Sequence, residues 1–148
     1  MLDWLLGPPL EVGTPAPDFD TLDQDGNRVH LAELRGSNVV LIFYPGDDTP
    51  VCRQQLCEFR DLRSEWSAKD TLVFGVNPSN ADSHQKFAGS QQFGFPLLVD
   101  RGQLIAQKYK ASGLLIRRTV YLIGKDGTIR YAERGKPDPR KVLQTATA

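Results

Sequence analysis

Two continuous apolar segments constrain the fold of this sequence more than any other feature. They read NVVLIFY at residues 38–44 and TLVFGV at residues 71–76, and β-branched and aromatic residues dominate both. Strands buried on both faces of a sheet have this composition. Between the segments, apolar residues recur every three to four positions, the period of an amphipathic helix; they are Leu56, Phe59, Leu62 and Trp66. The order strand, helix, strand predicts a right-handed βαβ unit.

The remaining segments extend this unit into a mixed sheet. Turn signals in residues 17–31 (DQDGN) and at 124–127 (GKDG) predict two β-hairpins. The other expected elements are a helix at 80–93, a strand at 95–100, a short helix at 103–109, and a closing helix at 137–146 with Asp138 as N-cap and Pro139 in its first turn. This order predicts an α/β protein with a thioredoxin-like fold, in which helices flank a mixed central sheet and a β-hairpin extends the N-terminus.

Length and charge narrow the class of protein. The 148 residues suit one domain, 1–148, in which residues 1–12 form an N-terminal arm. Lysine plus arginine equals aspartate plus glutamate at 18 each, and no basic stripe suggests a nucleic-acid partner. No apolar run approaches the roughly 18 residues that a membrane span needs. Two cysteines do not make a secreted disulfide framework, so we expect a reducing, cytoplasmic compartment.

Both cysteines lie in one short stretch, FYPGDDTPVCRQQLCEFRD. Thr49 is a favourable N-cap residue and Pro50 suits the first position of a helix. Cys52 then occupies the third helical position, where unpaired amides and the helix dipole favour a thiolate. Its position alone leaves two readings open, an activated thiol and an inert, packed one.

The spacing to Cys57 indicates a conformational switch. Five helical residues separate two Cα atoms by about 8.7 Å. A disulfide requires Cα atoms within about 6.8 Å, so the thiols cannot bond while the helix is intact. Bond formation would require the first turns to unwind. A zinc site is not expected, because the pair supplies two ligands and neither His30 nor His84 has ligand spacing. For His84, in a predicted helix, a solvated or structural role is favoured over catalysis.

The stretch FYPGDDTPVC, with Pro45, Thr49 and Cys52, resembles the P-x-x-x-T-x-x-C signature of the peroxiredoxins. A second cysteine five positions later is similar to the peroxiredoxin Q subfamily, also called bacterioferritin comigratory protein. The likeness runs from GTPAPDFDTLDQDGNRVHLAELRG through DSHQKFA and FPLLVD to RRTVYLIGKDGTI, which is nearly the whole domain.

The resemblance implies a role for each matching residue. Cys52 would attack the peroxide and become a sulfenic acid, and Cys57 would resolve it as a disulfide. Thr49 would contact thiolate and peroxide, and Pro45 would shield the thiolate. The resemblance also implies an arginine beside the sulfur. Arg117 and Arg118 are adjacent and point to opposite faces of a strand, so spacing alone does not choose between them.

The resemblance selects Arg118, and it also implies substrates and partners. Hydrogen peroxide and organic hydroperoxides would be reduced, and thioredoxin or glutaredoxin would recycle the disulfide. No metal, flavin or nicotinamide is implied, and Gly-rich nucleotide motifs are missing from the sequence. Members of the subfamily are mostly monomers, with dimers as the alternative.

The sequence departs from the subfamily pattern around Cys52. Val51 stands where the subfamily often has Gly, and Arg53 and Gln55 stand where it often has Thr and Glu. Loss of a carboxylate and gain of a cation both favour a thiolate at Cys52, but they put in doubt the hydrogen bonds that the Glu would make.

Two other functions remain open from the sequence. The paired thiols also fit a protein thiol–disulfide oxidoreductase, although the usual C-x-x-C is missing and Pro45 and Thr49 would then be unexplained. They fit, too, a non-enzymatic redox sensor that passes its state to a partner protein.

Overall fold

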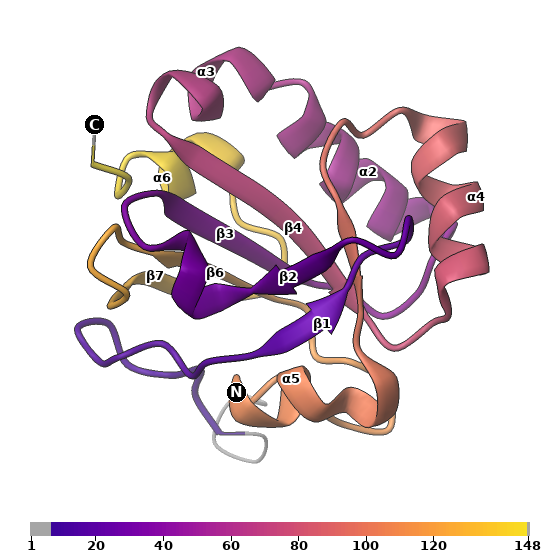
Figure 1. The fold of residues 1–148 in the computed structure, drawn as a ribbon, viewed down its shortest axis with the longest axis horizontal. Helices are drawn as coiled ribbons and strands as arrows, with labels where there is room; N and C mark the ends of the chain where they lie inside the picture. Colours follow the sequence, from indigo (N-terminus) through magenta and orange to yellow (C-terminus); the bar gives the residue numbers. More distant parts are fainter. Residues whose placement is uncertain (1–6, 148) are drawn as a thin grey trace.

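A five-stranded mixed sheet forms the centre of the computed structural model, which describes residues 7–147 (Figure 1). The strand order across the sheet is β5-β4-β3-β6-β7. The first three run parallel to one another, and β6 and β7 continue the sheet in antiparallel fashion. Their bounds are β3 (Asn38–Phe43), β4 (Thr71–Asn77), β5 (Leu97–Val99), β6 (Thr119–Ile123) and β7 (Ile129–Arg134). This is the mixed thioredoxin-like sheet that the sequence predicts.

The predicted βαβ unit joins β3 to β4, and two helices form its crossover. Helix α2 (Pro50–Arg60) is followed by α3 (Arg63–Ala68) after a break at Asp61 and Leu62. The indole nitrogen of Trp66 donates to the carbonyl of Phe59 at 2.9 Å, and this bond fixes the angle between the helices. Both aromatic residues are buried, as expected.

Alternation along β3 divides the core into two halves. Val40 and Ile42 pack with α2 and α3 on one face, together with residues of α4 (Ala81–Gln91) and α6 (Pro139–Leu143). Leu41 and Phe43 pack on the other face, with α5 (Leu104–Lys108) and the N-terminal hairpin. Since β3 is buried at every position, its uniform hydrophobicity follows from helices or loops on both faces.

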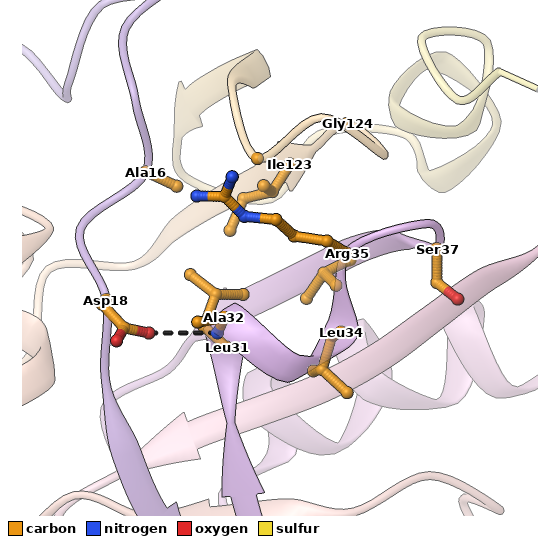
Figure 2. A pocket seen from close by; sticks show the side chains of 11 residues that line it. Ala16, Asp18, Leu31, Ala32, Leu34, Arg35, Ser37, Ile123 and Gly124 are labelled. Atoms are coloured by element: carbon orange, nitrogen blue, oxygen red, sulfur yellow. Dashed lines mark hydrogen bonds between the residues drawn. The ribbon is translucent and has the colours of Figure 1, made fainter.

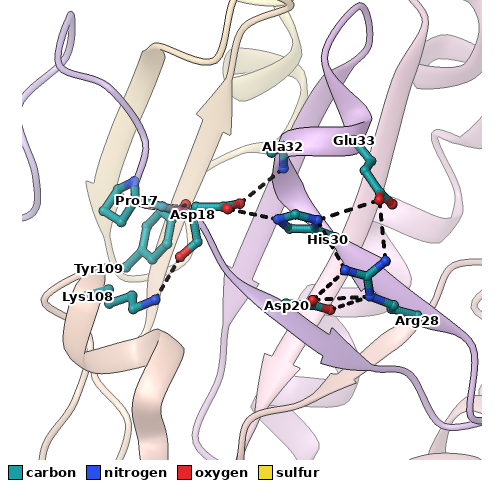
Figure 3. Close-up of polar contacts among 9 residues, drawn as sticks. All are labelled: Pro17, Asp18, Asp20, Arg28, His30, Ala32, Glu33, Lys108 and Tyr109. Carbon is teal, nitrogen blue, oxygen red and sulfur yellow. Dashed lines mark hydrogen bonds and ion pairs between the residues drawn. The ribbon is translucent and has the colours of Figure 1, made fainter.

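The predicted N-terminal hairpin is formed by β1 (Asp20–Leu22) and β2 (Arg28–His30), which continue into the 3-10 helix η1 (Leu31–Leu34). Polar contacts attach it to the domain (Figure 3). The Asp18 carboxylate lies 2.8 Å from His30 Nε2 and accepts from the Ala32 amide at 3.1 Å. Lys108 Nζ donates to the Asp18 carbonyl at 2.9 Å, so α5 holds the strand leading into the hairpin.

The remaining elements lie close to their predicted places. The helix expected at 80–93 is α4, the strand expected at 95–100 is shortened to β5, and the helix expected at 103–109 is the 3-10 turn η2 (Arg101–Gln103) followed by α5. Asp138 caps α6 as predicted, because its carboxylate accepts from the Arg140 amide at 2.9 Å. Part of the expected arm lies outside the described residues, but the Leu10 amide donates to the Tyr121 hydroxyl at 3.0 Å.

Candidate active site

Helix α2 begins at the predicted residue with Thr49 as its N-cap residue, but the Thr49 hydroxyl does not cap the helix. The backbone of Thr49 is extended and its carbonyl accepts from the Arg53 amide at 2.8 Å, as an N-cap residue does. Its hydroxyl makes no capping bond with the helix and lies 3.5 Å from the carbonyl of Gly46. The predicted N-cap residue is thus confirmed, although its side chain makes no bond to the helix. The hydroxyl is turned back toward the active-site loop, which we define as residues 45–49.

Cys52 lies at the sheet end of α2 with no exposed surface. Its Sγ accepts from Arg118 Nη2 at 3.2 Å, across a sequence separation of 66 residues. The register of β6 explains this meeting, because Thr119 pairs with Phe43 and so Arg118 lies beside the chain that leaves β3 for the active-site loop. Of the two adjacent arginines, Arg118 is the one that faces the sulfur, and it brings a permanent positive charge to it.

Gln55 forms hydrogen bonds at the position where the subfamily often has Glu and where the loss of that carboxylate put such bonds in doubt. The residue is 1% exposed, and its Oε1 accepts from Arg118 Nη1 at 2.6 Å. Its Nε2 reaches the Gly135 carbonyl at 3.4 Å, and the Gly135 amide donates to the Arg118 carbonyl at 2.6 Å. A neutral amide thus orients the guanidinium without neutralising it. Sequence reasoning noticed the lost charge at Gln55 but missed the retained contact.

Pro45 lies two residues after the end of β3 and is half-buried at the start of the active-site loop. The next buried polar group is Asp47, which sequence reasoning missed. Its Oδ1 accepts from the Tyr44 hydroxyl at 2.7 Å, and its Oδ2 lies 2.6 Å from both Ser83 Oγ and His84 Nδ1. These contacts join the loop to α4.

The environment changes the acidity of two of these groups. Burial acts to raise the pKa of Asp47, but the bonds from His84, Ser83 and Tyr44 outweigh it and lower that pKa. Burial and the neighbouring Asp47 raise the pKa of Tyr44 well above its usual value. Asp47 is therefore a buried carboxylate that three donors stabilise. His84 is fully buried in this cluster, which is the position of a structural residue.

Cys57 lies on the same continuous helix as Cys52, and both thiols are free. It is half-buried, and its Sγ lies 3.6 Å from Gln91 Oε1 at the end of α4. With α2 intact, helix geometry separates the two Cα atoms by about 8.7 Å. In this state the second sulfur contacts α4 and is out of reach of the first.

Hollows lie both beside this site and away from it, and one that adjoins the active-site loop is bordered by Asp47, Asp48 and Ser83. A hollow of about 120 Å³ on the hairpin side of the sheet is bordered by Ala16, Leu31 and Gly124, and the side chain of Arg35 extends across it (Figure 2). It is separated by the sheet from the core half that holds Cys52. Across residues 7–147, no three His, Cys, Asp or Glu side chains gather so as to hold a metal ion. No helix in this part of the chain combines the length and the apolar character that a membrane span demands.

Comparison with known proteins agrees with this geometry. The AhpC/TSA family matches residues 12–132, a range that contains both cysteines and Arg118. Peroxiredoxin bcp of Helicobacter pylori strain J99 is 37% identical over 148 residues, covering 92% of this chain and 97% of the relative.

Solved structures agree as well. The crystal structure of peroxidoxin BcpB from Mycobacterium tuberculosis is similar with a TM-score of 0.85 and 29% identity, covering 92% of this chain and 96% of that one. The bacterioferritin comigratory protein of Xanthomonas campestris is similar with a TM-score of 0.80 and 25% identity, covering 91% of this chain and 94% of that one. This chain therefore belongs to the AhpC/TSA family, among its peroxiredoxins of the bacterioferritin comigratory protein type, and is a thiol-dependent peroxidase.

Proposed function

We propose that Cys52 is the peroxidatic residue of this peroxidase. The observation that carries the proposal is the 3.2 Å contact between Arg118 Nη2 and the Sγ of Cys52 at the first turn of α2. The thiolate attacks one oxygen of the peroxide, an S–O bond forms and the O–O bond breaks. Cys52 becomes a sulfenic acid, and the leaving oxygen takes up a proton and departs as water or an alcohol.

Three neighbours support this step. Arg118 stabilises the thiolate and then the negative charge that develops on the leaving oxygen. The Thr49 hydroxyl forms no bond with the helix, so it is available to contact the peroxide. Pro45 has no N–H and a fixed ring, so it shields one side of the sulfur without competing for hydrogen bonds.

Cys57 is proposed as the resolving residue. Its thiol condenses with the Cys52 sulfenic acid, an S–S bond forms and water leaves. The separation of the two sulfurs along α2 requires the start of this helix to unwind first. Release from Gln91 is a second requirement, since the Cys57 thiol contacts that side chain in the folded state.

The disulfide is then reduced by an external dithiol, for which we propose thioredoxin or glutaredoxin in the cytoplasm. The dithiol attacks one sulfur, a mixed disulfide forms, and its second thiol releases the reduced enzyme. We propose hydrogen peroxide and organic hydroperoxides as substrates. The Xanthomonas campestris relative has alkyl peroxide reduction activity, which supports the organic class. We propose that the chain acts as a monomer.

Stopped-flow peroxide reduction by the wild type, Cys52→Ser and Cys57→Ser tests these roles. We expect Cys52→Ser to consume no peroxide, and Cys57→Ser to complete one fast turnover without thioredoxin-linked cycling. Mass analysis of the oxidised wild type should locate one disulfide between the two cysteines. Peroxide consumption by Cys52→Ser, or full cycling of Cys57→Ser with thioredoxin alone, would contradict the assignment.

A further inference from the structure

Helix α4 contacts the segment that carries both cysteines at two separate points. Near its start, Ser83 and His84 bind the carboxylate of Asp47 in the active-site loop, each at 2.6 Å. At its last residue, Gln91 accepts from Cys57 Sγ at 3.6 Å and, through its carbonyl, from Arg60 Nη1 at 2.7 Å. The residues between these points, 48–56, include Cys52 and the turns that must unwind. The folded state is therefore held on both sides of the part that moves.

The contact between His84 and Asp47 is buried within the protein. The ring is fully buried, and the Asp47 side chain is 6% exposed. Nδ1 faces the Asp47 carboxylate, while Nε2 lies 3.0 Å from the Leu98 carbonyl and 3.2 Å from the Asn77 carbonyl. All three partners are oxygen atoms that accept hydrogen bonds, so the ring has a polar partner at both nitrogens. The ring thus joins the active-site loop to the ends of β4 and β5.

The loop is also fixed from the strand side. The Tyr44 hydroxyl donates to Asp47 at 2.7 Å, and Asn77 Nδ2 donates to the Tyr44 carbonyl at 2.8 Å. Asp47 therefore connects the active-site loop to both the end of β3 and the start of α4. Loss of the His84 contact would let the mobile segment begin earlier, at the end of β3.

We propose that His84 is a positioning residue that sets the balance between peroxide reduction and resolution. By holding Asp47, it keeps the active-site loop in place for attack on peroxide and opposes the unwinding that brings Cys57 to the Cys52 sulfenic acid. The inference rests on the proposed roles of the two cysteines. Weakening the contact slows the first step and speeds the second, and the protein then loses less Cys52 to sulfinic acid.

Two substitutions at one position separate the two sides of the ring. The Asn amide of His84→Asn occupies the place of Nδ1 and retains the bond to Asp47. The Gln amide of His84→Gln occupies the place of Nε2 and retains the bonds to the carbonyls of Leu98 and Asn77. If the role of His84 is purely structural, both variants should behave alike. If His84 positions Asp47, only His84→Gln should change the balance between peroxide reduction and disulfide formation.

The measurement is rapid-quench mass analysis after one equivalent of hydrogen peroxide, which follows sulfenic acid and disulfide in time. For His84→Gln we expect disulfide formation about tenfold faster than in the wild type, the effect of losing one bond to a charged group. Peroxide reduction should be slower, and sulfinic acid in excess peroxide should fall. His84→Asn should stay within about twofold of the wild type. Equal rates in the two variants, or slower disulfide formation in His84→Gln, would overturn the proposal.

A second pair of variants tests the proposal without changing the buried ring of His84, where a substitution could disturb folding. Ser83→Ala removes one bond to Asp47 from a half-buried residue, and we expect disulfide formation to speed up severalfold. Gln85→Ala is the control on the same helix, because its amide donates to Asp25 Oδ1 in the turn between β1 and β2 and not to the loop. If Ser83→Ala matches Gln85→Ala, the inference is wrong. A wild type that forms no disulfide between its cysteines would instead refute the proposed function.

Discussion

Gln55 offers the most direct test of how the charge beside Cys52 is used. Gln55→Glu changes one amide to a carboxylate at a residue that is 1% exposed and already 2.6 Å from Arg118 Nη1. The shape and the hydrogen bond to Arg118 are preserved. The new negative charge, however, pairs with the guanidinium that faces the sulfur, so the variant isolates charge from geometry.

The size of the effect follows from the contacts around Arg118. The sulfur lies 3.2 Å from one guanidinium nitrogen, and the amide oxygen lies 2.6 Å from another. Taken end to end, these contacts and the guanidinium itself place the new carboxylate no more than roughly 8 Å from Sγ, where two like charges repel by about 2 kcal/mol at an effective dielectric constant of 20. The rate of peroxide reduction at neutral pH should then fall, by up to the roughly 30-fold that 2 kcal/mol represents.

The assay is the second-order rate of Cys52 oxidation by hydrogen peroxide, measured beside the rate of thiol alkylation. Gln54→Glu is the matched control, because Gln54 is the exposed neighbour on the same helix and receives the same charge in solvent. We expect the control to change either rate by less than about twofold, since water screens the added charge. Equal effects of the two substitutions, or unchanged rates in Gln55→Glu, would refute the reasoning.

Three further predictions concern Arg118, His30 and Gly75. Arg118→Lys should reduce peroxide at least about tenfold more slowly, because Lys lacks the planar fork whose two nitrogens contact Gln55 Oε1 and Cys52 Sγ separately; a wild-type stopped-flow rate would contradict this. The bond to Asp18 raises the pKa of His30, so its stabilisation is complete below about pH 6.5 and is lost as pH rises through the raised value; urea midpoints of the wild type and His30→Gln should converge in alkaline buffer, and a constant difference would refute it. Gly75→Ala should lower the free energy of unfolding by about 1–3 kcal/mol, because a Cβ would lie 2.6 Å from Leu97 Cδ2; Gly89→Ala, which meets no atom within 4 Å, should not destabilise in the same urea titration.

The sheet was predictable because its signals are local. The segments 38–44 and 71–76 became β3 and β4, since apolar β-branched runs suit strands covered on both faces. The turn GKDG lies between β6 and β7 as predicted. The break after α2 was not predicted, because Leu62 and Trp66 continue the apolar period and no Gly or Pro marks the end of the helix. Pro96 precedes β5, which begins only at Leu97.

The site was predictable where a motif placed it and unpredictable where contacts come from distant residues. Cys52 and Arg118 meet as the resemblance implied. The capping bond of Thr49 did not form, because its hydroxyl turns toward Gly46. Asp47 reads as an ordinary turn residue in a Gly-Asp-Asp loop. Its partner His84 lies 37 residues away on another helix, and no spacing rule connects them.

The separation between Cys52 and Arg118 has a consequence for biosynthesis. The guanidinium reaches the sulfur only when β6 has paired with β3, and it comes from 66 residues further along the chain. A nascent polypeptide that emerges from the ribosome therefore exposes its first thiol long before the neighbouring cation has been synthesised. The contact between this cation and the sulfur is therefore made only when the sheet is complete.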